Sequence, residues 1–138
     1  MHARRSILLS LAVASGAALA VLAPGTASAS DSNTAVASSG PSRSHWVYCL
    51  SDTGVEACYE RDRDLWFVRD TSANGHAAYA EWDNYYNGKP IRYGTCTNRL
   101  GAGHWGVCDK SYRAGSTIKF GATGIDSDAR VWSPELYA

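Results

Sequence analysis

Residues 64–82 read DLWFVRDTSANGHAAYAEW, and the pattern of this stretch decides the fold class. Residues 65–70 are rich in aromatic and β-branched side chains, and residues 77–82 alternate small residues with larger polar ones. Both patterns are typical of β-strands. Between them, Asn74-Gly75 tolerates the positive φ angles that a hairpin turn needs. The sequence therefore predicts a central β-hairpin.

The chain on either side of this hairpin repeats the rhythm of short strands. Aromatic or apolar runs recur about every ten residues, with Gly, Asn, Asp or Pro between them. No window shows the apolar stripe of an amphipathic helix. The sequence predicts an all-β fold, a small disulfide-stabilised antiparallel sandwich or barrel of about seven to nine short strands.

The N-terminal residues carry an export pattern. Arg4 and Arg5 precede an apolar run at residues 7–23, and residues 27–29 (ASA) form a small-x-small cleavage site. We predict that residues 1–29 are a signal peptide and that the mature protein is secreted, extracellular and free of the membrane after cleavage. The two arginines also fit a twin-arginine signal loosely, so both general secretion and twin-arginine export remain open.

Composition divides the remainder into two parts. Residues 30–44 are polar and contain no aromatic side chain, so they are predicted to form a disordered leader. Residues 45–138 hold every aromatic residue of the chain and have the length of a single β domain. A domain this small buries only about 60 to 65% of its unfolded surface, so its stability is expected to depend on large rings and on cross-links.

The charge balance argues against a nucleic-acid partner. The chain has 13 basic and 13 acidic residues, and loss of the two signal-peptide arginines leaves 11 against 13, a net charge of −2 before histidines. Charges alternate in sign at residues 60–64 (ERDRD). Without a basic stripe, counterion release from a phosphate backbone would contribute little.

Four cysteines in a short secreted chain predict two disulfide bonds. They are Cys49, Cys58, Cys96 and Cys108. Three pairings are possible, and we favour Cys49 with Cys58 and Cys96 with Cys108, because each pair brackets a short segment that contains glycine. A four-residue turn at residues 51–54 would set Cys49 opposite Glu56, so the first bridge requires a different loop. Neither spacing suits zinc, and no metal or cofactor is predicted.

Acidic motifs give no catalytic constellation. Asp52-Thr53-Gly54 is the active-site triplet of aspartic proteases, but its flanking residues do not fit, and a turn is the simpler interpretation. The carboxylates of residues 60–64 could pair as in a glycosidase, yet arginines interleave them, as in a solvated charge ladder. Asp126 and Asp128 have calcium-like spacing without the other ligands of a calcium loop. We predict no catalytic residue and no enzyme.

The most recognition-like part of the chain is residues 82–93, which mix Trp, Tyr, Asn and Gly, and we predict a loop at residues 83–90. Rings of this kind supply rigid contact area and amides adjust hydrogen bonds. The candidate ligand-binding residues are Trp82, Asp83, Asn84, Tyr85, Tyr86 and Arg92. The alternative is that Trp82 and one tyrosine turn inward as core, with Asn87-Gly88 as another turn.

These residues lead to a functional hypothesis. The protein is expected to be a monomeric, non-catalytic binding module that contacts an extracellular protein or glycan. The leading alternative is an inhibitor of an extracellular hydrolase, which would insert residues 111–115 or residues 83–89 into an active site.

One resemblance adds to this picture. Residues 93–109 (YGTCTNRLGAGHWGVCD), together with residues 66–70 and 78–82, resemble uncharacterised small secreted four-cysteine β proteins of actinobacteria. The resemblance implies a disulfide-stapled β domain exported by a Gram-positive cell. It implies no activity and no site residue.

Overall fold

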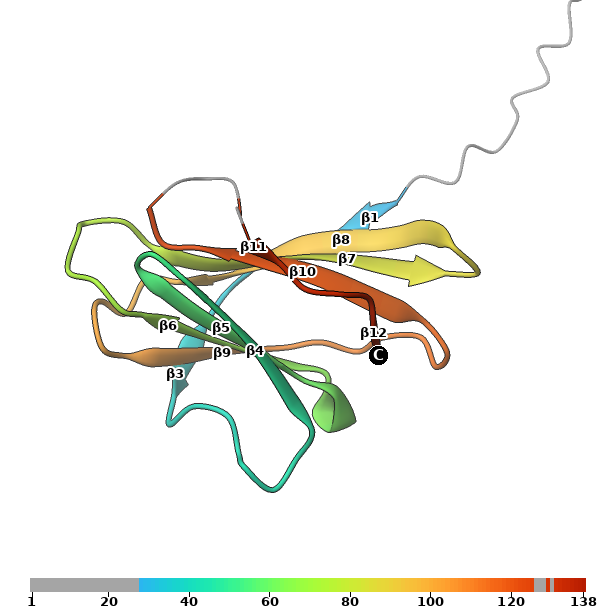
Figure 1. The fold of residues 1–138 in the computed structure, drawn as a ribbon, viewed down its shortest axis with the longest axis horizontal. Helices are drawn as coiled ribbons and strands as arrows, with labels where there is room; N and C mark the ends of the chain where they lie inside the picture. Colours follow the sequence, from blue (N-terminus) through green and yellow to red (C-terminus); the bar gives the residue numbers. More distant parts are fainter. Residues whose placement is uncertain (1–27, 126–128, 130) are drawn as a thin grey trace, which may run out of the picture.

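The computed structural model, which describes residues 28–125, 129 and 131–138, is a sandwich of two β-sheets (Figure 1). Sheet A holds β1 (Ala29–Ser30), β2 (Asn33–Thr34), β7 (Ala78–Tyr86), β8 (Lys89–Asn98), β10 (Thr117–Thr123), β11 (Val131–Trp132) and β12 (Leu136–Tyr137). Sheet B holds β3 (Val36–Ser38), β4 (Val47–Asp52), β5 (Val55–Glu60), β6 (Leu65–Asp70) and β9 (Trp105–Asp109). The predicted all-β, disulfide-stabilised sandwich is confirmed.

The two sheets run in the orders β1-β8-β7-β10-β11 and β3-β9-β6-β5-β4. They are separate layers rather than a closed barrel. The strand count exceeds the predicted number because five of the strands are only two or three residues long. The described residues contain one 3-10 turn, η1 (Arg61–Arg63), and none of their helices could cross a membrane.

The central hairpin predicted over residues 64–82 is wrong. β6 pairs with β5 and β9 in sheet B, whereas β7 pairs with β8 and β10 in sheet A, so residues 71–77 cross from one sheet to the other. Each strand presents large apolar residues to the core. Trp66 of β6 stacks on Trp82 of β7 across the sandwich, with ring centroids 6.4 Å apart, and both rings are buried. Asn74 lacks a positive φ, and its side-chain amide instead donates to the Gly124 carbonyl at 2.9 Å.

Two hairpins with two-residue turns lie elsewhere. At Asn87-Gly88 both residues have positive φ, 51° and 71°, as a type I′ turn between β7 and β8 requires. The β4–β5 turn contains only Thr53 and Gly54, because Asp52 pairs with Val55. Asp52-Thr53-Gly54 is therefore part of a turn, as the sequence indicated.

The tight β4–β5 turn also resolves the disulfide geometry. It places Cys49 directly opposite Cys58, so the two bond within one hairpin of sheet B. Cys96 on β8 bonds to Cys108 on β9 and so joins sheet A to sheet B through the core. Both predicted pairings are confirmed, but the second one fastens the two layers together rather than closing a local loop.

The predicted disordered leader at residues 30–44 is corrected by the structure, because β1 and β2 pair in parallel with β8 and β3 pairs with β9. Asp31 accepts hydrogen bonds from Arg92 and, at 2.7 Å, from the Lys110 ammonium. Ala35 is buried against Gly106, where an added Cβ would lie 2.6 Å from that of Ala35. Composition missed this segment because backbone pairing and one ion cluster hold it, not apolar side chains. The predicted signal peptide falls almost wholly on residues 1–27, outside the described residues.

Candidate functional site

The predicted recognition loop is mostly strand, so its residues alternate between the two faces of sheet A. Trp82 and Asn84 point into the sandwich and are each only 1% exposed. The Asn84 amide donates to the Ser116 hydroxyl at 2.9 Å. Asp83 and Tyr85 point outward. Trp82 and Asn84 are therefore core residues, as the alternative interpretation held for Trp82, and they are inaccessible to a ligand.

The other two predicted site residues also separate. Arg92 lies on the inner side of β8, where its guanidinium donates to the Ser111 carbonyl at 2.7 Å and sits 5.6 Å from the Trp82 ring centroid. Tyr86 lies at the far end of β7 and carries the Arg113 guanidinium 3.7 Å from its ring centroid. The six predicted residues do not form one surface.

A shallow groove on the outer face of sheet A includes only part of the predicted set. Its volume is about 210 Å³. The residues that line it come from β7, β8, β11 and the segment between β1 and β2; they are Ser32, Glu81, Trp82, Asp83, Tyr93, Gly94, Thr95 and Trp132. Tyr93 lies beside Asp83 and Thr95 beside Glu81 across the β7–β8 pairing. We call this hollow the Tyr93–Trp132 groove.

The two rings of the groove are exposed but differently supported. Trp132 is 43% exposed, and its indole Nε1–H donates to the Ala129 carbonyl at 3.1 Å. Its ring lies over Gly121 of β10, where an added Cβ would be 3.0 Å from the indole. Tyr93 is 47% exposed and lies on β8. The groove thus presents one pinned indole and one exposed phenol, with carboxylates and hydroxyls between them.

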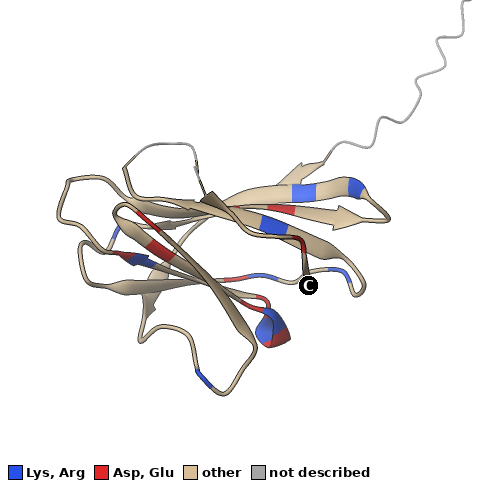
Figure 2. Cartoon of the chain, in the orientation of Figure 1, with Lys and Arg blue, Asp and Glu red and all other residues tan. Residues whose placement is uncertain are grey.

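Charges of both signs are interspersed over the molecule, and no stripe of a single sign crosses the face that Figure 2 shows. The acidic residues of the sequence motifs have structural partners. Glu60 is buried and receives the Arg63 guanidinium, whose hydrogen bond lowers the pKa of this carboxyl. Asp64 accepts the Tyr59 hydroxyl at 2.9 Å. Asp62 accepts the backbone N–H of Trp46. Each of these carboxylates therefore has a structural partner in the fold.

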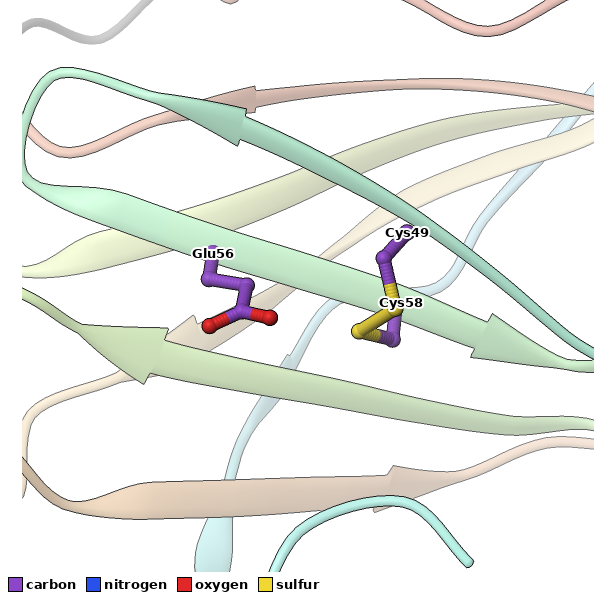
Figure 3. A group of neighbouring side chains, drawn as sticks. All are labelled: Cys49, Glu56 and Cys58. Atoms are coloured by element: carbon purple, nitrogen blue, oxygen red, sulfur yellow. A yellow bond between two sulfur atoms is a disulfide. The ribbon is translucent and has the colours of Figure 1, made fainter. Parts of the chain in front are cut away.

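One cluster of metal-ligating residue types occurs in the described part of the chain, at Cys49, Glu56 and Cys58 (Figure 3). The two sulfur atoms are bonded to each other, so no thiolate is present to bind a metal. The Glu56 carboxylate pairs with Arg69 at 2.5 Å. The predicted calcium-like pair, Asp126 and Asp128, lies outside the described residues.

Sequence reasoning missed most of the groove. Tyr93 and Asp83 belonged to the predicted region, residues 82–93, but Trp132 is distant in sequence and reaches the site through the pairing of β11 with β10. The alternation of Tyr93 and Thr95 with Gly94 and Cys96 was a usable signal for an outward face. Comparisons with protein-family models, with curated proteins and with solved structures found no match for this chain.

Proposed function

We propose that the protein is a secreted, non-catalytic module that binds a polysaccharide chain in the Tyr93–Trp132 groove. The observation that carries the proposal is Trp132, a half-exposed indole pinned flat on an open sheet face beside carboxylates. A rigid aromatic ring offers apolar contact area without an ordering cost on binding. The C–H faces of sugars fit such a ring.

The polar part of the groove suits the same ligand. Asp83 can accept hydrogen bonds from sugar hydroxyls, while Ser32 and Thr95 can both donate and accept them. The groove is shallow and open, which favours a chain that passes over the surface over a small molecule that must be enclosed. Sheet A therefore supports binding along a polymer.

Secretion is part of the proposal. Two disulfide bonds are present, and such bonds persist in oxidising surroundings outside the cytosol. The arginine-led apolar stretch at the N-terminus and the cleavage pattern at residues 27–29 supply the export route. An exported module with a polysaccharide-binding face would attach to a cell wall or to an insoluble nutrient polymer.

Retention on insoluble polysaccharides tests this function. The purified protein is incubated with chitin, cellulose or peptidoglycan, and the fraction removed from solution is measured. We expect Trp132→Ala and Tyr93→Ala each to weaken retention about tenfold or more. Trp46→Ala is the matched control, because Trp46 is 39% exposed but lies just before β4, outside the groove. Retention on none of the polymers, or equal loss in all three variants, would refute the proposal.

The position of Arg113 supports a second candidate function, inhibition of an extracellular hydrolase. Residues 111–115 form an exposed loop, and Arg113 within it is braced on the Tyr86 ring beside the β7–β8 turn. A braced, exposed side chain on a protruding loop suits insertion into the active site of a hydrolase. Inhibition of extracellular proteases that disappears in Arg113→Ala but survives in Trp132→Ala would favour this function over polysaccharide binding.

A further inference from the structure

A second hollow lies on the opposite side of the molecule, against the outer face of sheet B. Residues 39–46 connect β3 to β4, strands at the two edges of sheet B, and swing away from the sheet between them (Figure 1). The space beneath this loop has a volume of about 510 Å³, more than twice that of the Tyr93–Trp132 groove. We call it the loop pocket. Its volume lies in the range of small-molecule sites, about 300–1,000 Å³.

One wall of the loop pocket is a held aromatic ring. Trp105 of β9 lines the pocket. Gly40 approaches this ring so closely that an added Cβ would lie 3.0 Å from the indole nitrogen, and its φ of +94° also favours glycine. The Arg69 guanidinium lies 5.0 Å from the ring centroid. The indole is therefore fixed in place before any ligand arrives.

The floor of the pocket contributes no net charge. It contains Cys49, which is disulfide-bonded to Cys58, and Glu56, whose carboxylate is neutralised by Arg69 at 2.5 Å. Figure 3 shows the Glu56 side chain on the same side of β5 as the disulfide. The disulfide is an apolar, polarisable surface, so a flat apolar group can rest on this floor.

The loop itself supplies an unmatched positive charge. Arg43 lines the pocket, and its guanidinium has no hydrogen bond or ion pair among the described residues. His45, also in the lining, is 3.6 Å from the Asp62 carboxylate. Of the charged groups that line the pocket, Arg43 is thus the one whose charge is left for a ligand. A guanidinium binds a carboxylate through two parallel hydrogen bonds.

We propose that the loop pocket binds a small aromatic carboxylate, with its ring against Trp105 and its carboxylate on Arg43. A monoanion fits better than a phosphate, because Arg43 is the one cation in the lining that lacks a partner among the described residues, and it matches a single negative charge. This site is separate from the Tyr93–Trp132 groove, since the two lie on outer faces of different sheets.

Calorimetric titration with N-acetyl-L-tryptophan tests the proposal, with the neutral N-acetyl-L-tryptophanamide as the matched probe. We expect the acid to bind about tenfold more tightly than the amide, with an advantage that declines as salt is added. Arg43→Gln should remove that advantage and leave amide binding unchanged. Arg99→Gln, an equal charge change at an exposed residue outside the pocket lining, should leave both unchanged. Trp105→Leu should weaken the binding of both the acid and the amide, because both probes place their ring against Trp105.

Three results would overturn the assignment. They are no heat of binding for either probe, equal affinities for acid and amide, and full acid binding in Arg43→Gln. Trp132→Ala separates this site from the proposed function, because it should weaken retention on polysaccharide and leave the titration unchanged. Failure of one proposal therefore does not decide the other.

Discussion

Trp82 and Trp132 belong to the same sheet and lie on its opposite faces. Trp82 is 1% exposed, and its indole N–H is buried without a hydrogen-bond partner among the described residues. Lys110 and Arg92 lie 5.4 and 5.6 Å from its ring centroid. Trp132 is 43% exposed, and its N–H is satisfied by Ala129. The same residue type is thus a core element on one face and a presented surface on the other.

The comparison shows that nearby charge does not by itself mark a site. The cations beside Trp82 are committed to Asp31, which Lys110 reaches at 2.7 Å, so they fix the N-terminal segment across the end of the sandwich. The carboxylates beside Trp132 line an open groove. Which face a ring and its charged neighbours occupy decides whether they stabilise the fold or face solvent.

The largest effect should come from Trp82→Ala. The indole stacks on Trp66 and meets Tyr112 edge-on, so its loss leaves a large cavity and should cost about 3–5 kcal/mol of unfolding free energy. Urea unfolding measures this. Trp132→Ala should cost less than about 1 kcal/mol. Equal losses in the two variants would show that the faces do not differ as described.

The two disulfides extend the same contrast between core and surface. In the chain-entropy model, each bond stabilises the fold by about 2.5–3 kcal/mol, because it restricts the unfolded chain. Cys96 and Cys108 are buried and join the sheets, so replacing both by alanine should cost about 1 kcal/mol more than replacing Cys49 and Cys58. In native protein treated with a thiol reductant, we expect the exposed Cys49 bridge to be reduced first. Mass spectrometry after alkylation gives the order, and the reverse order would contradict it.

Asp31→Asn tests the ion cluster that Asp31 forms with Lys110 and Arg92. Burial alone raises the pKa of Asp31, but hydrogen bonds and positive charge from Lys110 and Arg92 outweigh it and lower the pKa. The ionised carboxylate therefore stabilises the folded protein at pH values above its unfolded pKa of about 3.9. This stabilisation is lost as the pH falls from there through the lower pKa of the folded state. We expect the variant to lose about 2 kcal/mol at neutral pH, because Lys110 keeps no paired charge.

The pH profile of urea unfolding distinguishes this account from a general loss of packing. The difference between wild type and Asp31→Asn should shrink below about pH 4, where the wild-type carboxylate also becomes protonated. Asp109→Asn, at an exposed position of β9, is the control and should follow the wild-type profile. A difference that stays constant down to about pH 2 would mean that the ion cluster does not hold the segment.

The sequence was sufficient for the fold class and for both disulfides, because strand periodicity and cysteine spacing are local signals. It failed where the signal depends on partners far along the chain. Residues 65–70 and 77–82 were each recognised as strand-forming, but their assignment to different sheets depends on packing between Trp66 and Trp82. The N-terminal strands were missed because Asp31 finds Lys110 only in the folded chain.

The candidate site shows the same limit more sharply. Residues 82–86 were interpreted as part of a loop, in which all of their side chains could face the same ligand. In the structure they belong to a strand, and the turn is confined to Asn87-Gly88. Strand alternation then removes Trp82 and Asn84 from the surface. Trp132 could not be placed from the sequence, since only the register of β11 on β10 brings it over Gly121.

Gly121→Ala should have a modest effect on stability and still alter binding. An added Cβ would lie 2.5 Å from the Ala129 Cβ and 3.0 Å from the Trp132 ring, so both must move outward. Gly121 does not have a positive φ, and alanine suits a strand better than glycine, which offsets part of the strain. We expect a stability loss of about 1–2 kcal/mol, because the Ala129 Cβ is fixed to its backbone and can move only with it, together with retention on polysaccharide weakened toward that of Trp132→Ala. Retention at the wild-type level would show that the pinned position of the indole, as distinct from its presence, contributes nothing to binding.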